Sequence, residues 1–191
     1  MDRTLRLALF SLLCNLVFAG YHLAVGLMSG SWWLLTLGSY YLILSIVRFA
    51  VLRGGWSDRF MTRFTGRMLM ALSLPLLGTV ILSVVRDRGH KLHMIVMIAM
   101  AAYAFTKITL ATINLVKSRR NACASVSALR SISFADAFVS IFALQRSMLV
   151  SFDGMTEGEI LIMNAVFGSA VCVTVFLLGL NLARKKFLKK F

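Results

Sequence analysis

The sequence predicts an all-α, polytopic membrane protein with six transmembrane helices. Its composition is the first observation: 59% of the 191 residues are hydrophobic and 15% are charged, whereas soluble domains have about 45–50% apolar and about 25% charged residues. The second is length, because the apolar runs extend over about 18–25 residues, enough for a helix to cross a hydrocarbon core of about 30 Å. The third is that most basic residues gather in alternate loops. We expect residues 1–191 to form a single transmembrane domain.

The apolar runs define the expected elements. An uncharged turn, Ser29-Gly30-Ser31, joins the first two runs, and a basic connector containing glycine is expected over 53–67. Trp32 and Trp33 open the second run, where we expect them to anchor it at the membrane interface. Pro75 lies inside the third run, and a membrane helix tolerates such a proline with a kink. In chain order the expected spans are 5–28, 32–52, 68–85, 92–116, 131–151 and 160–182.

The basic residues indicate an orientation. Most of them lie in the N-terminal residues, in 53–67, in 117–130 and in the tail after Leu182, whereas the loop between the fifth and sixth runs is acidic. Lysine and arginine in short loops stay on the cytoplasmic side. We therefore expect both termini in the cytoplasm. The compact loops favour a multi-pass protein of the cell membrane, specifically the bacterial cytoplasmic membrane.

The net charge of +14 has a second interpretation, which is nucleic-acid binding. The basic residues are divided among segments that flank apolar runs, and only those at the end of the chain alternate with aromatic residues that could stack on bases. We therefore expect no nucleic-acid partner, and the lipid bilayer as the main partner. The tail ARKKFLKKF is expected to contact anionic headgroups, each basic residue contributing up to about 1 kcal/mol.

The sequence contains no pattern typical of an enzyme. It has no HExxH, no GxSxG, no glycine-rich phosphate loop and no paired carboxylates on an expected helix. Cys14, Cys123 and Cys172 are far apart in the sequence and have no CxxC spacing, so we expect neither a disulfide nor a thiolate metal site. We predict no enzymatic activity and no cofactor.

Two segments carry a family resemblance. The first, CNLVFAGYHLAVGLMSGSWWLL, has an asparagine in the first span and a glycine-serine turn into the second. The second, SRRNACASVSALRSISFADAFVS, brings Asp136 to the start of the fifth span. Both are similar to the corresponding segments of cation diffusion facilitators, the proton-coupled exporters of zinc, iron and manganese. The resemblance implies six spans, both termini inside the cell and a homodimer.

The chain departs from that family at the metal site. In the family, pairs of His or Asp four residues apart on spans two and five hold the metal, because this spacing puts both ligands on one helix face. The matching positions here are Tyr40 with Leu44 and Val139 with Ala143, none of which is a good zinc ligand. Nine residues follow Leu182, so the family's cytoplasmic metal-binding domain is not expected either. We expect no metal.

Arg48, Lys107 and Asp136 are charged residues well inside the expected spans. Because a charge in the hydrocarbon costs about 2.5–3.5 kcal/mol on insertion scales, each marks a candidate functional site. Arg48 and Asp136 lie at matching depths from the cytoplasmic side, and Lys107 lies deeper and competes for the same acid. The Arg48–Asp136 pair is open to three interpretations: an ion pair that fixes helix register, a fixed cation in place of a metal, or a gate. Arg48 alone could also extend to the interface.

Other polar residues share faces with these charges. Tyr40 lies on one face with Leu44 and Arg48, and Asn15 and His22 are seven residues apart on one face of the first span. His22 is expected as an interior hydrogen-bonded residue, with two alternatives: a proton relay or, together with Glu157 or Glu159, a weak metal contact. Arg146 is expected as an anchor near the outer interface.

Two functions remain open at this point. In the first, the chain is transport-related, and a substrate other than a bare divalent ion, or protons alone, moves along the faces of spans two and five. In the second, it is an inactive relative of a transporter that serves as a scaffold or interaction subunit. The candidate path or gate residues are Asn15, His22, Tyr40, Arg48, Lys107 and Asp136.

Overall fold

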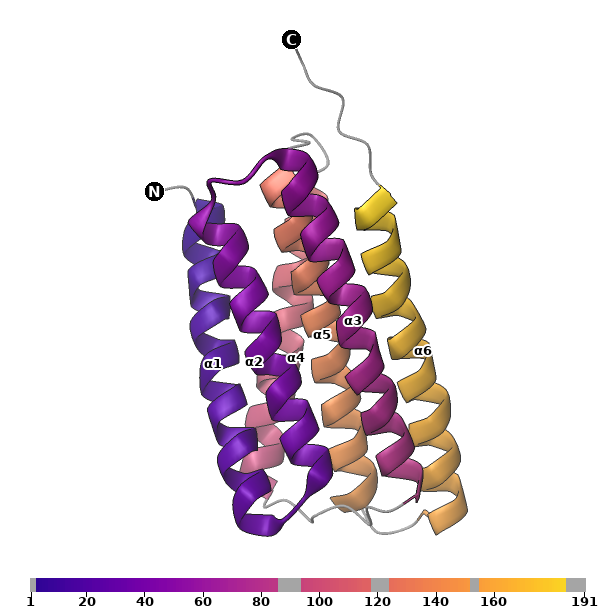
Figure 1. The fold of residues 1–191 in the computed structure, drawn as a ribbon. Coiled ribbons are helices and arrows are strands. Elements are labelled where there is room, and N and C mark those ends of the chain that lie inside the picture. Colours follow the sequence, from indigo (N-terminus) through magenta and orange to yellow (C-terminus); the bar gives the residue numbers. More distant parts are fainter. Residues whose placement is uncertain (1–2, 86–93, 118–123, 152–154, 185–191) are drawn as a thin grey trace.

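The computed structural model describes residues 3–85, 94–117, 124–151 and 155–184, and over these residues the chain is all-helical. The predicted all-α architecture is confirmed there. Figure 1 shows the helices side by side in one bundle, with the start of the first and the end of the last at the same end. The helices are α1 (Arg3–Ser29), α2 (Trp32–Arg53), α3 (Asp58–Val85), α4 (Met94–Lys117), α5 (Ala124–Ser151) and α6 (Glu157–Arg184).

The helices have the length and the surface of a membrane bundle. All except α4 are long and apolar enough to cross a bilayer, and in α4 the apolar stretch whose side chains are described, Met100–Ile113, is shorter. Large apolar side chains face outward on several helices, among them Leu13, Ile46 and Leu74, whereas polar side chains lie inside. The core is largely apolar, as in a soluble bundle, but the apolar outer surface together with the buried polar groups is compatible with a multi-pass membrane protein.

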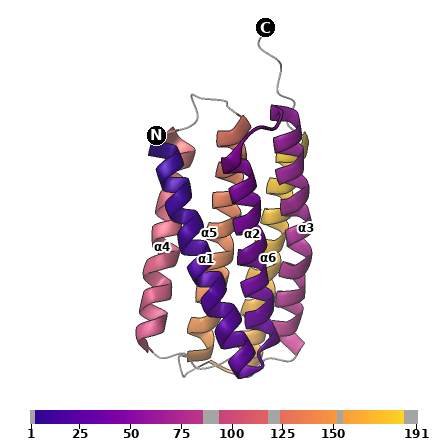
Figure 2. The same cartoon turned by 60° about the vertical axis from the view of Figure 1, so that its left-hand side comes forward.

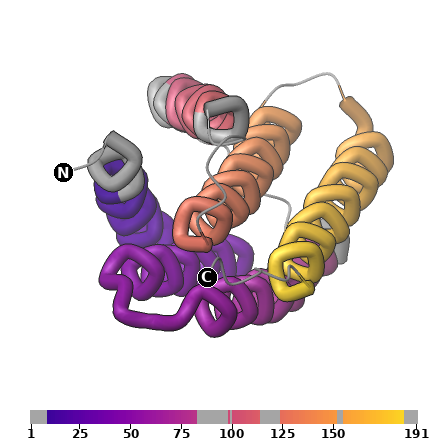
Figure 3. The backbone as a smooth tube through the Cα atoms, turned by 90° about the horizontal axis from the view of Figure 1, so that it is seen from above, coloured from indigo at the N-terminus to yellow at the C-terminus, as the bar shows by residue number. Residues whose placement is uncertain are grey.

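Helix α5 occupies the centre of the bundle. It packs against α2, α3, α4 and α6, and the view along the bundle in Figure 3 shows it between α4 and α6. Figures 2 and 3 both show α4 at one edge, beside α5. The buried positions of α5 include Ala128, Ala135 and Ser140, and such small side chains let neighbouring backbones approach closely in a membrane.

The predicted turn between the first two helices is present. Helix α1 ends at Ser29, Gly30 has φ of 64°, and the Ser31 N–H donates to the Gly26 carbonyl oxygen at 3.1 Å. This is the hydrogen bond of a Schellman motif, in which a glycine in the left-handed region ends the helix. The motif reverses the chain at once, so that α1 and α2 form a tight antiparallel pair.

Helix α3 begins ten residues before the predicted span at Met68, so the expected connector over 53–67 is wrong after Ser57. Met61, Thr62 and Thr65 are buried, because their spacing puts them on one face of the first turns. This face packs inside the bundle although the opposite face is basic. The charges that suggested a connector are therefore the exposed side of a helix.

Helix α5 likewise begins before its predicted span, at Ala124 rather than Ser131. Ala124, Ala128 and Ile132 are buried at four-residue spacing. By composition this serine-containing segment resembles a loop, but in a helix a serine hydroxyl can bond to the carbonyl four residues earlier, as the next two serines, Ser131 and Ser133, do.

Two glycines bring α3 and α6 into backbone contact. A Cβ atom added at Gly66 would lie 2.6 Å from the Gly179 carbonyl oxygen, and one added at Gly179 would lie 2.8 Å from the Gly66 carbonyl oxygen. Real Cβ atoms do not approach other atoms so closely, so the crossing point accepts only glycine. Close approach of this kind is a main source of helix association in lipid, because apolar side chains gain nothing by leaving the lipid tails.

We predict that Gly66→Ala and Gly179→Ala each lower the free energy of unfolding by about 1–3 kcal/mol, the usual cost of overpacking. The measurement is the thermal unfolding midpoint of the purified protein in a neutral detergent. Gly20→Ala and Gly78→Ala are matched controls, since a Cβ atom at either position meets no atom within 4 Å. Equal midpoints for all four variants would contradict the close contact of α3 and α6.

Candidate functional site

The candidate site is centred on the carboxylate of Asp136 in α5, whose side chain is only 2% exposed. Lys107 of α4 donates from Nζ to Oδ1 at 2.5 Å. Arg48 of α2 donates from Nη2 to Oδ2 at 3.3 Å, and Asn15 of α1 donates from Nδ2 to the same oxygen at 2.8 Å. Four helices thus meet at one acid. We call Asn15, Arg48, Lys107 and Asp136 the Asp136 cluster.

The sequence places these side chains through buried helical stripes. Asp136 lies on the interior face of α5, with Ile132, Val139 and Ser140. On α2 the interior face carries Arg48 one turn after Leu44. Residues separated by about one turn share a face, so each charged group reaches the interior because its apolar neighbours do.

Ser140 extends the cluster by one turn of α5. Its hydroxyl donates to the Asp136 carbonyl oxygen at 2.8 Å. Its oxygen also accepts from Lys107 Nζ at 3.1 Å and lies 3.1 Å from the Tyr41 hydroxyl oxygen. A serine has one hydroxyl proton and two acceptor sites, so in this arrangement Tyr41 is the donor to Ser140. Every hydrogen-bonding position of the Ser140 hydroxyl is then used.

Aromatic rings surround the Lys107 ammonium group. Its Nζ lies 4.2 Å from the centre of the Tyr103 ring and 4.8 Å from that of Tyr41, distances at which a cation is attracted to a ring face. The Tyr103 hydroxyl donates to Asn15 Oδ1 at 2.8 Å, and its ring stacks on Phe18 at 3.8 Å between centres. Tyr103 therefore fixes the Asn15 amide, so that its NH₂ group points to Asp136.

Arg48 is held inside the bundle. It is 1% exposed, and besides Asp136 it donates to the hydroxyl groups of Ser11 and Ser133. The alternative in which Arg48 extends to the membrane interface is therefore wrong. The expected pairing with Asp136 is present, and Lys107 shares the acid rather than displacing Arg48.

The cluster contains two basic groups and one acid. Arginine keeps its proton in proteins, whereas a buried lysine can release its own. Lys107 is therefore the group through which this site can exchange a proton with Asp136. Because both carboxylate oxygens already accept hydrogen bonds from cationic groups, the site as built does not offer a free carboxylate to a metal ion.

His22 and Tyr40 lie beside the cluster rather than in it. His22 is buried, its Nδ1 is 2.8 Å from the Phe18 carbonyl oxygen, and its ring centre is 5.8 Å from that of Tyr41. Tyr40 is buried against Tyr41, and its hydroxyl has no hydrogen-bond partner in the described part of the chain. His22 is therefore connected to the site through Tyr41, and Tyr40 contributes packing.

Two residues of the site that were not predicted, Ser140 and Tyr103, have a recognisable spacing in the sequence. Ser140 follows Asp136 by four residues, and Tyr103 precedes Lys107 by four. Polar side chains one turn from a buried charge share its face, and a search on that spacing would have found both. The sequence has no comparable signal for Ser11, because only the packing of α1 on α2 brings it to Arg48.

The expected anchors at the other end of α2 and α5 are partly wrong. Trp32 is 67% exposed, as an interfacial anchor should be, but Trp33 is buried. Arg146 is also buried, and its guanidinium carbon lies 4.3 Å from the centre of the Trp33 ring. A cation on a tryptophan face is stabilised where water is excluded, so these two side chains stabilise each other inside the bundle.

The four positions that the resemblance would match to metal ligands lie in the apolar core. Tyr40, Leu44, Val139 and Ala143 are all buried. Over the described residues, no three side chains of His, Cys, Asp or Glu gather in one place. Comparisons with protein-family models, with curated proteins and with solved structures gave no match for this chain.

We predict that Asp136→Ala lowers the free energy of unfolding by about 3–5 kcal/mol, the cost of leaving a buried charge without its partner. Lys107→Met should cost less, because Asp136 keeps Arg48 and Asn15. The measurement is the yield and the thermal midpoint in detergent. Asp58→Ala is the control, since this acid is exposed in the first turn of α3. A normal yield and midpoint for Asp136→Ala would contradict the assigned pairing.

Proposed function

We propose that this chain is a multi-pass membrane transport protein in which the Asp136 cluster gates the path, and that protons, not bare divalent cations, pass the gate. One observation carries the proposal: a buried carboxylate is shared by a fixed cation, Arg48, and a cation that can lose its proton, Lys107. Ionisable residues inside a membrane bundle are typical of proton and ion pathways. The resemblance to proton-coupled exporters supports the same class.

A chain of hydrogen-bonding groups supports proton movement. From Asp136 it passes through Lys107 to Ser140, which also accepts from the Tyr41 hydroxyl. A proton moves between Lys107 and Tyr41 once the Ser140 hydroxyl turns away from the Asp136 carbonyl oxygen, and His22 lies beside Tyr41. In the opposite direction Arg48 links Asp136 to Ser11. Ser11 and His22 are eleven residues apart on α1, which is about 16 Å along a helix. The groups therefore extend over about half of a hydrocarbon core.

A proton transfer within the cluster provides the gating step. The Nζ–H bond of Lys107 breaks and an O–H bond forms on Asp136, so the ammonium and carboxylate become an amine and a carboxylic acid. The total charge does not change, but Arg48 loses the anion that holds it. The contact between α2 and α5 is then weakened, and the bundle can open at this level. Return of the proton to Lys107 restores the ion pairs.

The same charges disfavour a bare divalent cation. Two positive groups lie within hydrogen-bonding distance of the one acid, and repulsion between charges is strong where water is absent. The positions that would hold a metal in the family carry Tyr40, Leu44, Val139 and Ala143. Following the charge distribution and the resemblance, the proposal includes cytoplasmic termini, a homodimer and the bacterial cytoplasmic membrane.

A second function is favoured by how completely the cluster is closed. Asn15, Arg48, Lys107 and Asp136 are each at most 7% exposed. In a scaffold or interaction subunit the network would serve only to fix helix register, and it would stay dry. In a transporter it must open at times to water, so flux separates the two functions.

We predict that proteoliposomes containing the native chain acidify in response to a potassium diffusion potential, and that Asp136→Asn and Lys107→Met reduce the rate to that of protein-free vesicles. The measurement is the fluorescence of a pH dye in the lumen. Asp58→Asn, which alters an exposed acid, should retain the native rate.

The same vesicles separate the competing functions when they are loaded with zinc and manganese indicators. Divalent-cation flux that Asp136→Asn abolishes would contradict the proton assignment and restore metal export. The absence of any flux from correctly folded, inserted protein would favour the scaffold. Two variants are used because Asp136→Asn alone could fail to assemble.

A further inference from the structure

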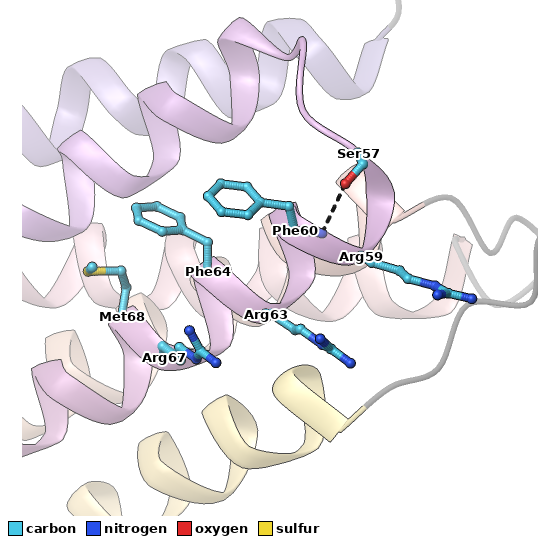
Figure 4. A pocket seen from close by; sticks show the side chains of 7 residues that line it. All are labelled: Ser57, Arg59, Phe60, Arg63, Phe64, Arg67 and Met68. Carbon is cyan, nitrogen blue, oxygen red and sulfur yellow. Dashed lines mark hydrogen bonds between the residues drawn. The ribbon is translucent and has the colours of Figure 1, made fainter.

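The first three turns of α3 present two parallel rows of side chains. Arg59, Arg63 and Arg67 form one row, and Phe60, Phe64 and Met68 form the other. Figure 4 shows the arginines extending to one side of the helix and the two rings to the other. Residues at four-residue spacing are neighbours on a helix surface. Between the rows, and next to Ser57, lies an open groove of about 470 Å³, which we call the α3 groove.

The aromatic side of the α3 groove is a packed surface. The Phe60 and Phe64 rings lie nearly parallel at 6.0 Å between centres, and Trp56 meets both edge-on at 5.3 and 5.2 Å. Phe60 is nevertheless 53% exposed. These rings stabilise one another on the outside of the bundle, where they offer an ordered apolar surface to the surroundings.

The basic side of the α3 groove is free to bind an anion. The three arginines are exposed, and no ion pair joins them to an acid over the residues that the structure describes. Repulsion among three like charges on one helix face costs stability, which an anionic ligand would relieve. Guanidinium groups bind phosphate oxygens in a forked geometry that suits this role.

The α3 groove lies at the depth of lipid headgroups. Helix α3 has 28 residues, a length of about 42 Å, whereas a hydrocarbon core is about 30 Å thick. Its first turns, at the same end of the bundle as the start of α1 and the end of α6 (Figure 1), therefore extend into the interface, where aromatic rings are stable. A ligand there meets the basic row at its polar end and the aromatic row along its apolar part.

We propose that the α3 groove binds one anionic phospholipid, with its phosphate between the arginines and an acyl chain along Phe60, Phe64 and Met68. The adjacent apolar and basic rows match a molecule that has both characters, which a soluble phosphate has not. A second copy of the chain does not match, because the same basic row would face itself. This site is independent of the transport proposal, since no residue of the Asp136 cluster lines it.

The experiment is native mass spectrometry of the full chain in a neutral detergent, titrated with phosphatidylglycerol or with phosphatidylcholine. Each basic residue near an anionic lipid is worth a factor of about five in binding, so Arg63→Gln with Arg67→Gln should weaken phosphatidylglycerol binding about thirtyfold. The matched control is Arg53→Gln with Arg184→Gln. It removes the same charge from exposed helix ends at the same end of the bundle, outside the groove.

Binding that falls equally in the control pair would overturn the proposal, because general surface charge would then explain it. Equal binding of phosphatidylcholine and phosphatidylglycerol would do the same. Unchanged thermal midpoints show that the variants are folded.

A second arm tests the acyl chain. Phe64→Ala should weaken phosphatidylglycerol binding and leave the weak binding of inorganic phosphate unchanged. Displacement of the lipid by inorganic phosphate or glycerol phosphate at millimolar concentration would overturn the proposal in favour of a soluble anion. The full chain is used throughout, so that the basic tail contributes equally to every variant.

Discussion

The burial of the Asp136 carboxylate is the constraint on which the rest of the structure depends. A carboxylate in a medium of low dielectric constant is tolerated only when it is paired and hydrogen-bonded. Here the compensation comes from side chains of three other helices, Asn15, Arg48 and Lys107. The acid therefore specifies which faces of α1, α2, α4 and α5 turn inward.

The other contacts between helices depend on close packing. Inside a membrane, apolar side chains are as well solvated by lipid as by one another, so helices associate through close contact and through polar groups. This bundle contains both kinds of helix association, close contact and contact through polar groups. Helices α3 and α6 meet through Gly66 and Gly179, and α4 is joined to α1 by the contacts of Tyr103 with Asn15 and Phe18. The first contact is a matter of shape, and the second is a matter of hydrogen bonds and ring stacking.

The glycine contacts and the contacts between ionisable groups differ in how they respond to protonation. A glycine crossing is fixed, because it depends only on shape and does not respond to protonation. A network of ionisable groups has more than one arrangement of protons, and each arrangement changes the attraction between helices. The contact of α3 with α6 at Gly66 and Gly179 is of the first kind, and the contacts around Asp136 are of the second. The α3 groove lies on the first turns of α3, outside both sets of contacts.

Several features were determined by the sequence itself. The lengths of the apolar runs predict the six helices, because the thickness of a bilayer sets the length of a span. The Gly30 turn could be predicted as well, because a left-handed residue between two runs favours glycine. The matching depths of Arg48 and Asp136, and the competition from Lys107, followed from a count of residues along each span. In a bilayer a buried cation needs a compensating partner, and the acids within the spans are so few that this requirement leaves very few candidate ion pairs.

Other features were decided only by the tertiary structure. The early starts of α3 and α5 depend on neighbouring helices that bury Thr65 and Ala128, since by composition these segments resemble loops. Trp33 and Arg146 are buried in the bundle rather than placed at the interface, and each is stabilised there by contact with the other. The role of Ser11 could not be predicted, because serine hydroxyl groups are common in apolar helices and most of them bond to their own backbone. A buried charge has few possible partners, whereas a hydroxyl group or an aromatic ring can be buried beside many different groups. The packing of the helices therefore decides which hydroxyl groups and rings contact the buried charges.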